Sequence, residues 1–274
     1  MDIGLTGVHV LITGASGGIG LETAKSFSVS RSKQSNLDQG CYVTAHYNSN
    51  LAPLQPLIDQ YGADRITALK ADLTVEKDVI HLFSAIPTVQ VAVINHGIWP
   101  TEDVPVASMS LAQWEKTIAC NLTSSFLVAR EYLKKLSIAP ENIKDKASIV
   151  LIGSSSGRFG EAGHADYSAS KSALMYGVTL SLKNEIVKIA KHGRVNCIAP
   201  GWVKTPMAEQ ALQNPDVVYA ALATTPLKRV AEPIDVANQV LVIASPILSR
   251  HVTGEVIMVT GGLEGRLLNK PHDI

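Results

Sequence analysis

Seven short apolar runs recur along the chain, and longer segments with helical periodicity separate them. The runs cover residues 8–12, 42–45, 66–69, 91–94, 149–152, 195–198 and 256–259. Continuous apolar runs of this length are typical of strands buried on both faces. Strands that alternate with helices form right-handed βαβ units, and these build a parallel sheet. The sequence therefore predicts a single doubly wound α/β domain over residues 1–274, with a seven-stranded parallel sheet and helices on both faces.

The balance of charges favours a small-molecule partner. Lys plus Arg and Asp plus Glu both number 24, so no net field attracts nucleic acid or anionic lipid. No run approaches the roughly 18 apolar residues that a membrane span needs, and no basic region of a secretory signal opens the chain. We therefore expect a cytoplasmic protein with neither a nucleic-acid nor a membrane partner.

Neither the cysteines nor the histidines form a metal-binding pattern. Cys41, Cys120 and Cys197 are far apart and lack C-x-x-C spacing, which favours buried structural thiols. The eight histidines show no H-E-x-x-H spacing. We expect no metal site, and we expect the polar tract at residues 31–39 to be an exposed insertion.

A glycine-rich turn follows the first expected strand. Residues 13–20 read TGASGGIG and precede LETAKSF, which has helical character. Glycines let the backbone turn tightly and approach a pyrophosphate, whose charge then lies at the free N–H groups of the following helix. An ordinary glycine-rich turn is the alternative. Because the turn opens the first βα unit, the sequence favours a dinucleotide site in a Rossmann-type domain.

The spacing Thr-Gly-x-x-x-Gly-Ile-Gly resembles the cofactor motif of the short-chain dehydrogenase/reductase family. Three further segments are similar to family motifs: Asp72 in Ala-Asp-Leu-Thr, Asn95-His96-Gly97, and the run PGWVKT at 200–205. The second is one residue shorter than the family's Asn-Asn-Ala-Gly and has a histidine in the middle. The resemblance implies that Asp72 binds adenine, although a helix N-cap is the alternative, and that 200–205 contacts the nicotinamide carboxamide. The implied cofactor-binding residues are Gly14, Ser16, Gly18, Ile19, Gly20, Asp72, Leu73, Asn95, Gly97, Pro200, Gly201, Val203 and Thr205.

The end of the second expected strand favours NADP(H) over NAD(H). An acidic residue here would bind the ribose 2′-hydroxyl of NAD and repel a 2′-phosphate. No acid occurs in residues 41–58, and His46, Asn48 and Ser49 are the expected neighbours of the phosphate. NAD(H) stays possible because this stretch also lacks an arginine.

Tyr167 and Lys171 are four residues apart in a segment with helical character, which places them on one helical face. An ammonium about 4 Å from a phenol, at an effective dielectric constant of ~20, is worth at most roughly 4 kcal/mol, or about three pKa units. That is enough to make a tyrosine a usable acid or base near neutral pH. The pair alone would be a weak signal, but the glycine-rich turn upstream strengthens it.

The family resemblance completes a catalytic set. It places a serine 13 residues before the tyrosine, at Ser154, with Ser155 and Ser156 as alternates. It also implies that Asn121 holds a proton-relay water and that Lys171 and Tyr167 contact the nicotinamide ribose. We therefore expect hydride transfer between a nicotinamide and a ketone or secondary alcohol, with Tyr167 as the general acid/base and Ser154 as a hydrogen-bond donor to the substrate oxygen.

Two other functions remain as alternatives. Residues 153–157, GSSSG, match the G-x-S-x-G elbow of serine hydrolases, with Ser155 as nucleophile. The glycines at 157–163 make a poor helix start, and Asp235 and His251 lie in no supporting motif. The other alternative is a silent nucleotide-sensing or scaffold protein, which the complete catalytic set disfavours.

The substrate should bind at the loops that follow the fourth and sixth strands. Trp99 and Trp202 lie there and either line an apolar pocket or pack a lid, and His164 is either a substrate contact or a loop residue. We expect a substrate lid at about residues 203–230, with helical character over 206–226. The resemblance also implies a homodimer or homotetramer.

Overall fold

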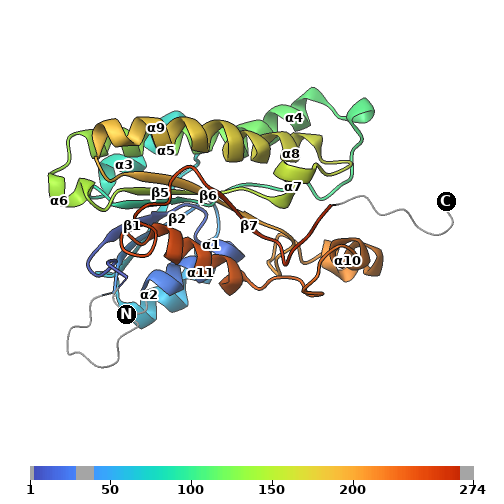
Figure 1. The fold of residues 1–274 in the computed structure, drawn as a ribbon, viewed down its shortest axis with the longest axis horizontal. Coiled ribbons are helices and arrows are strands. Elements are labelled where there is room, and N and C mark those ends of the chain that lie inside the picture. The colour runs from blue at the N-terminus through green and yellow to red at the C-terminus, as the bar shows by residue number, and fades with distance from the viewer. Residues whose placement is uncertain (1–2, 29–39, 266–274) are drawn as a thin grey trace.

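The computed structural model describes residues 3–28 and 40–265 (Figure 1). The expected insertion at residues 31–39 lies outside this part of the chain. Seven strands form one parallel sheet in the order β3-β2-β1-β4-β5-β6-β7. They are β1 (His9–Ile12), β2 (Tyr42–Tyr47), β3 (Ile66–Lys70), β4 (Val91–Ile94), β5 (Ser148–Ile152), β6 (Arg194–Pro200) and β7 (Val256–Val259). The predicted fold class is therefore confirmed.

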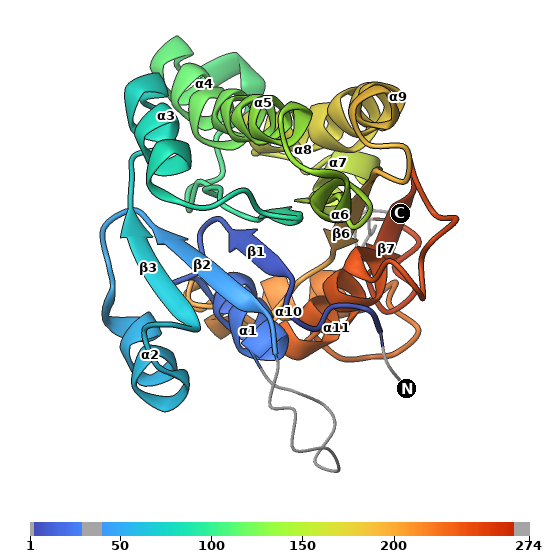
Figure 2. The ribbon, with the colours of Figure 1, turned by 90° about the vertical axis from the view of Figure 1, so that its left-hand side faces the viewer.

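Helices cover both faces of the sheet (Figures 1 and 2). One face carries α1 (Gly18–Ser28), α2 (Gln55–Tyr61) and α11 (Pro233–Ala244). The other carries α3 (Glu76–Ala85), α4 (Leu111–Ile118), α5 (Ser124–Ser137), α8 (Ala165–Ser172) and α9 (Thr179–Ile189). Successive strand residues point to opposite faces, so each strand supplies two cores. In β5, Ile149 and Leu151 enter the core under α5 and α9, whereas Val150 and Ile152 enter the core over α1 and α11.

Two pairs of these helices are each joined into one long helix by a π-helical turn. Residues Ala119–Thr123 join α4 to α5, and residues Ala173–Val178 join α8 to α9. The shorter helices are α6 (Glu141–Lys144), α7 (Ser155–Phe159) and α10 (Pro215–Leu222), with 3-10 turns at Ala52–Leu54, Val106–Ser108 and Ala211–Gln213. No helix among residues 3–28 and 40–265 is long and apolar enough to cross a membrane.

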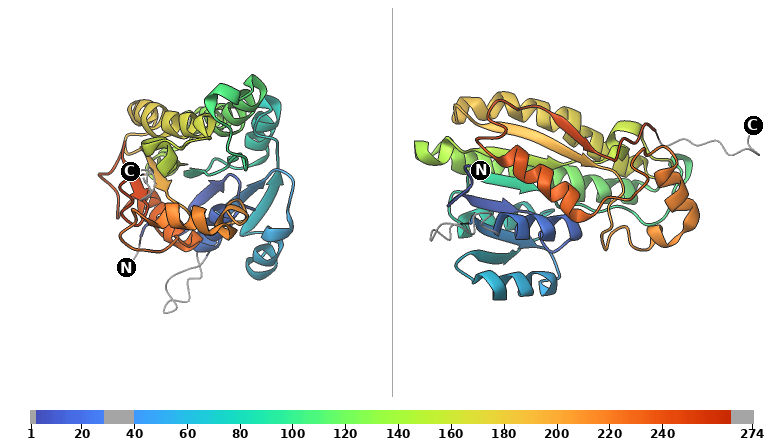
Figure 3. Two further views of the ribbon diagram at one scale, coloured as in Figure 1. Left: turned by 90° about the vertical axis from the view of Figure 1, so that its right-hand side faces the viewer. Right: turned by 60° about the horizontal axis from the view of Figure 1, so that its bottom comes forward.

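The segment expected to form a lid contains a helix at α10, which lies at the same end of the molecule as α7 and α8 (Figures 1 and 3). Asn214 caps it by accepting a hydrogen bond from Asp216 N, and Pro215 occupies its first turn, where no N–H is needed. Strand β6 is longer than expected, because Pro200 still pairs with Val259 at the end of the sheet.

A buried arginine joins β6 to the end of α11. Arg194 is 5% exposed, and its guanidinium donates hydrogen bonds to Ile243 O (2.6 Å) and Ala244 O (2.9 Å). These carbonyls belong to the last turn of α11, where such groups lack partners within the helix and a cation is favourable. Arg194 therefore satisfies polar groups that would otherwise be buried unpaired.

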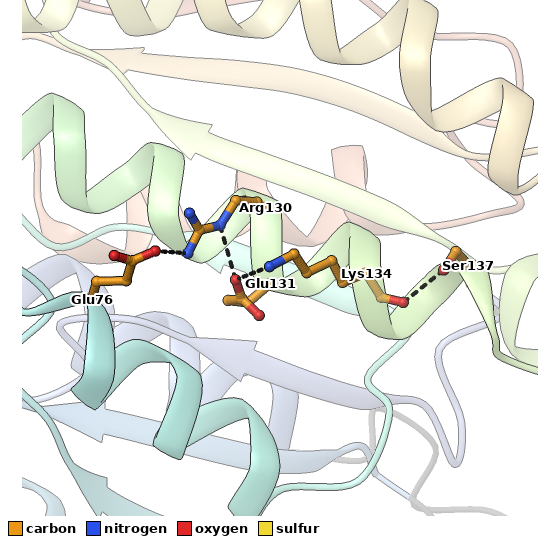
Figure 4. A network of polar contacts seen from close by, with 5 residues as sticks. All are labelled: Glu76, Arg130, Glu131, Lys134 and Ser137. Carbon is orange, nitrogen blue, oxygen red and sulfur yellow. Dashed lines mark hydrogen bonds and ion pairs between the residues drawn. The ribbon is translucent and has the colours of Figure 1, made fainter.

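A second arginine lies in an ion-pair network on the surface of α5 (Figure 4). Arg130 donates to Glu76 of α3 (2.6 Å) and to Glu131 (2.9 Å), which also accepts from Lys134 (2.9 Å). Burial opposes ionisation of Glu131, but the hydrogen bonds from Lys134 and Arg130 outweigh it and lower its pKa. The pair with the exposed Glu76 contributes little to stability, and the buried carboxylate of Glu131 keeps Lys134 as a partner when Arg130 is replaced.

We expect Arg194→Met to lower the free energy of unfolding by about 2–4 kcal/mol, because it leaves two buried carbonyls without donors. Urea denaturation followed by circular dichroism measures the loss. Arg130→Met is the matched control and should change stability far less. Equal losses in the two variants would contradict the role assigned to Arg194.

Candidate active site

A cavity of about 400 Å³ lies at the carboxyl ends of the strands. Such an edge is where ligands bind to open α/β sheets. Of the site residues expected from the sequence, all but Gly20 and Asn121 line it. They are Gly14, Ser16, Gly18, Ile19, His46, Asn48, Ser49, Asp72, Leu73, Asn95, Gly97, Ser154, Tyr167, Lys171, Pro200, Gly201, Val203 and Thr205.

The glycine-rich turn packs too tightly for side chains. Gly14 has φ +62°, and a Cβ on it would lie 2.9 Å from His96 Cα. A Cβ on Gly20 would lie 2.2 Å from Gly14 O and 2.7 Å from Asn95 Nδ2. The sequence predicts Gly20 among the cofactor-binding residues, but Gly20 does not line the cavity. Its missing side chain instead allows α1 to pack directly against the turn.

His46 holds this turn in place. It is 2% exposed, its Nδ1 accepts a hydrogen bond from Gly14 N (3.1 Å), and its Nε2 donates to Ala71 O (3.0 Å). Burial lowers the pKa of the imidazole, which favours this neutral tautomer. Both ring nitrogens of His46, which the sequence predicts beside a phosphate, have backbone partners. Asn48 and Ser49 are exposed and line the cavity.

The shortened loop after β4 is anchored to the same turn. Asn95 Nδ2 donates to Thr13 O (3.0 Å) and Gly14 O (3.1 Å). The ring of His96 lies 2.7 Å from Thr13 Oγ1 on one side and 2.7 Å from Ser124 Oγ on the other. Burial, together with His46 and Lys171, lowers the pKa of His96 to about 3. His96 is therefore a neutral bridge between β1 and α5, a role that the sequence did not reveal.

Asp72 lines the cavity and shapes a turn before α3. Its Oδ1 accepts hydrogen bonds from Thr74 N (2.9 Å) and Thr74 Oγ1 (2.6 Å), which forms a turn before α3. The N-cap position of α3 is Val75, so Asp72 is not the helix cap. The hydrogen bonds from Thr74 lower the pKa of the carboxyl group. Asp72 thus presents an ionised side chain at the cavity.

Tyr167 and Lys171 lie on α8 and meet as their spacing predicts. Lys171 Nζ is 5.7 Å from the centre of the Tyr167 ring and donates to Ile152 O (2.8 Å) at the end of β5. The lysine is 4% exposed, and burial lowers its pKa to about 8. A cation is therefore held next to the phenol in a poorly solvated place.

Ser154 lies at the end of β5 and caps α7. Its Oγ accepts from Ser156 N (3.1 Å) and donates to Ser156 Oγ (3.2 Å). The glycines after Ser155 do not prevent a helix: α7 begins at Ser155 and ends at Phe159, and Gly160, with φ +73°, is its C-cap. The expectation of a poor helix start is wrong because the Ser154 cap favours the first turn.

The triad proposed for a serine hydrolase is not assembled. Ser155 is fully buried and does not line the cavity. Asp235 instead accepts hydrogen bonds from Arg229 and from Glu232 N at the start of α11, and His251 is exposed in the loop before β7. Buried away from the cavity, Ser155 has no access to a substrate bound there.

Asn121 lies behind the cavity rather than on its wall. It is fully buried in the π-helical turn, where its Oδ1 accepts from Ile98 N (2.7 Å) and its Nδ2 donates to Ile98 O (2.9 Å) and Ser170 Oγ (3.1 Å). A Cβ on Gly97 would lie 3.0 Å from Asn121 Oδ1 and 3.5 Å from Lys171 Nζ. Asn121 thus fixes the loop after β4 close to Lys171.

The two tryptophans lie together in the lining of the cavity. Trp99 and Trp202 both line it and contact edge to face, with ring centres 5.8 Å apart. His164 does not line the cavity. It is buried and stacks under Trp99 at 4.7 Å, so the structure gives it a packing role. Cys120, expected to be buried, is half-buried and lines the cavity, whereas Cys41 and Cys197 are buried as expected.

Comparisons with known proteins agree with this geometry. A family model described as "Enoyl-(Acyl carrier protein) reductase" matches residues 14–264. The 3-oxoacyl-[acyl-carrier-protein] reductase FabG of Aquifex aeolicus (strain VF5) is 31% identical, over 96% of this chain and 100% of its own length. Nodulation protein G of Rhizobium sp. (strain N33) is 32% identical, over 94% of this chain and 98% of its own.

Solved structures are similar over nearly their whole length. A short-chain dehydrogenase/reductase from Brucella melitensis, titled glucose/ribitol dehydrogenase, has a TM-score of 0.81 at 28% identity and covers 96% of this chain and 99% of its own. A putative gluconate dehydrogenase from Agrobacterium tumefaciens has a TM-score of 0.83 at 26% identity and covers 95% of this chain and 97% of its own.

The lowered pKa of Lys171 makes a prediction about stability. The folded protein binds this proton more weakly than the unfolded chain does, so below pH 8 the buried ammonium destabilises the fold. Lys171→Met should therefore be more stable than the wild type at pH 7, by up to about 3 kcal/mol. The difference should shrink between pH 8 and 10.5, as measured by urea unfolding at each pH. Lys188→Met, at an exposed site on α9, is the control, and a pH-independent difference for Lys171→Met would contradict the prediction.

Proposed function

The chain belongs to the short-chain dehydrogenase/reductase family, and we propose that it is an NADP(H)-dependent oxidoreductase that reduces a ketone or oxidises a secondary alcohol. The observation that carries the proposal is the shared cavity. The glycine-rich turn lines it together with Ser154, Tyr167 and Lys171. One ligand bound along the cavity would reach both. The names of the relatives describe both carbonyl reduction and alcohol oxidation, with different substrates.

The residues around the glycine-rich turn fit a dinucleotide. The first turn of α1 lines the cavity, and the first N–H groups of a helix have no partners within it. A Cβ on Gly18 would lie 2.6 Å from Thr205 Cγ2, so side-chain atoms would fill this part of the cavity. The end of β2 carries Asn48 and Ser49 rather than a carboxylate, which supports NADP(H).

The side chains of the site have distinct tasks in this reaction. A bound nicotinamide supplies or accepts the hydride. In the reduction direction the Tyr167 phenol donates a proton to the substrate oxygen. Ser154 donates a hydrogen bond to the same oxygen after turning its hydroxyl away from Ser156. Lys171, held by Ile152 O, stabilises the phenolate that remains.

Asn121 and His96 hold the loop after β4 in position beside these side chains. Asn121 binds both backbone polar groups of Ile98, and His96 bridges Thr13 and Ser124. These contacts fix the loop after β4 between the glycine-rich turn and Lys171. We include in the proposal that Asn121 supports a proton-relay water near Lys171 and that residues 203–230 form a lid over the substrate.

We expect Tyr167→Phe to bind NADPH as the wild type does but to lose ketone reduction by about 10²- to 10⁴-fold in kcat/KM, because the variant lacks the proton donor. Quenching of Trp99 and Trp202 fluorescence measures binding, and absorbance at 340 nm measures turnover over a panel of ketones. NADPH should bind more tightly than NADH. Failure of both nucleotides to bind would overturn the cofactor proposal, whereas binding without Tyr167-dependent turnover would favour the nucleotide-sensing alternative.

We also propose a homo-oligomer that uses the outer surface of α5 and α9. Leu180 and Val187 share one face of α9, because they are seven residues apart, and Tyr176 lies in the π-helical turn just before α9; the three side chains are 38–45% exposed. Phe126 on α5 is half exposed. Helices α5 and α9 contact each other, so these residues lie on neighbouring elements.

Light scattering after size exclusion should give a dimer or tetramer for the wild type. Tyr176→Glu with Leu180→Glu should shift the mass to that of a monomer, because the charges would be buried at the interface. Ile247→Glu replaces an equally exposed apolar residue after α11 and is the control. A wild-type monomer would contradict this proposal.

A further inference from the structure

Two loops beside the tryptophans are joined to each other by hydrogen bonds and by stacked rings. They are residues 98–105, after β4, and residues 160–164, between α7 and α8. Val104 N donates to Gly163 O (2.9 Å), and His164 Nε2 donates to Pro100 O (2.8 Å). The Trp99 ring stacks on the His164 ring with an interplanar angle of 10°. Both loops are therefore held in a defined position before any ligand binds.

The second loop brings a carboxylate to the cavity. Glu161 lines the cavity, and its backbone carbonyl accepts a hydrogen bond from His164 N (3.1 Å). Its Oε2 accepts from Ser156 Oγ (2.5 Å), and Ser156 Oγ in turn accepts from Ser154 Oγ (3.2 Å). The carboxylate is thus two hydrogen bonds away from the hydroxyl that we assign to the substrate oxygen.

The surroundings of Glu161 limit what can bind beside it. Trp99, Trp202, Ile98 and Met207 provide apolar surface in the lining of the same cavity, and the loop that carries Ile98 and Trp99 is bound to the loop of Glu161. A carboxylate has about four acceptor positions, so Glu161 can keep its bond to Ser156 and its other contacts within the protein while it accepts a further bond from a ligand. A ligand carboxylate or phosphate at the same place would meet a like charge.

We propose that Glu161 determines substrate specificity by accepting a hydrogen bond from a donor group next to the reacting carbon. The inference rests on the proposed oxidoreductase function, which places the substrate oxygen at Ser154. A ligand group that reaches Glu161 from there is two or three bonds from the reacting carbon. The preferred substrates are therefore hydroxyketones and vicinal diols, or their amino counterparts, and 2-keto acids are excluded.

Four ketones of matched size test this with NADPH as the reductant: hydroxyacetone, aminoacetone, butanone and pyruvate, each with its longer homologues. We expect the wild type to reduce the hydroxyketone or the aminoketone with a kcat/KM at least about tenfold above that for the plain ketone. Glu161→Gln should bring the ratio to about threefold or less and should raise the activity on pyruvate. The hydroxyl and amino arms identify which donor the site prefers.

Two further variants separate a specific effect from a general one. Ser156→Ala removes the hydrogen bond that orients the carboxylate, so it should lower the ratio of hydroxyketone to butanone activity, whatever it does to the absolute rates. Glu255→Gln changes an exposed glutamate before β7, at the opposite end of the sheet, and should leave the ratio unchanged. An equal ratio in the wild type and Glu161→Gln would overturn the inference.

Binding measured without turnover decides the question separately. Calorimetric titration of the protein with NADP⁺ should show propane-1,2-diol binding at least about fivefold more weakly to Glu161→Gln than to the wild type, with butan-2-ol unaffected. Equal diol affinities, or no diol binding to the wild type, would overturn the role of Glu161. Turnover of butanone or pyruvate alone would also overturn it while leaving the oxidoreductase proposal standing. If the wild type reduced none of the ketones in a Tyr167-dependent way, the oxidoreductase proposal would be contradicted. The diol titration would still test the role of Glu161.

Discussion

The backbone of the glycine-rich turn needs hydrogen-bond partners that the sheet supplies only in part. At the end of β1 the chain leaves the sheet, where Thr13 N and Ala15 N still donate to backbone carbonyls of β4 and β2. Side chains supply further partners: His46, at the end of β2, accepts from Gly14 N, and Asn95, after β4, donates to Thr13 O and Gly14 O. The start of α1, and with it one end of the cavity, depends on these contacts.

The two histidine rings of this network, His46 and His96, are neutral, and this affects the Lys171 ammonium beside them. Burial lowers the pKa values of His46 and His96, so neither ring competes with Lys171 as a cation. Lys171 is the one lysine or arginine among the described residues that line the cavity. Its charge therefore acts on Tyr167 in a place where water screens it poorly. The same burial lowers the pKa of Lys171 itself, so the lysine is protonated less strongly than an exposed one would be.

The sequence predicts those parts of this site that depend on local patterns. The seven strands follow from short apolar runs, and the meeting of Tyr167 with Lys171 follows from helical spacing. The sequence does not predict the partners of His46, Asn121 and His164, because they lie 23 to 64 residues away along the chain. Glu161 was missed for the same reason: only the packing of its loop against residues 98–105 brings it to the cavity.

The π-helical turns explain how two long helices serve both the core and the site. A π turn adds a residue to the helix, which changes the direction of the side chains that follow. In the first helix, Thr117 before the turn donates to the buried carboxylate of Asp166, which also accepts from Tyr167 N. Within the turn Asn121 points to Ile98 and Ser170, and after it Leu127 and Val128 enter the core. The turn therefore separates two sets of side chains along one continuous helix. Those before and within it contact residues of the site, whereas those on α5 form an apolar face against the sheet.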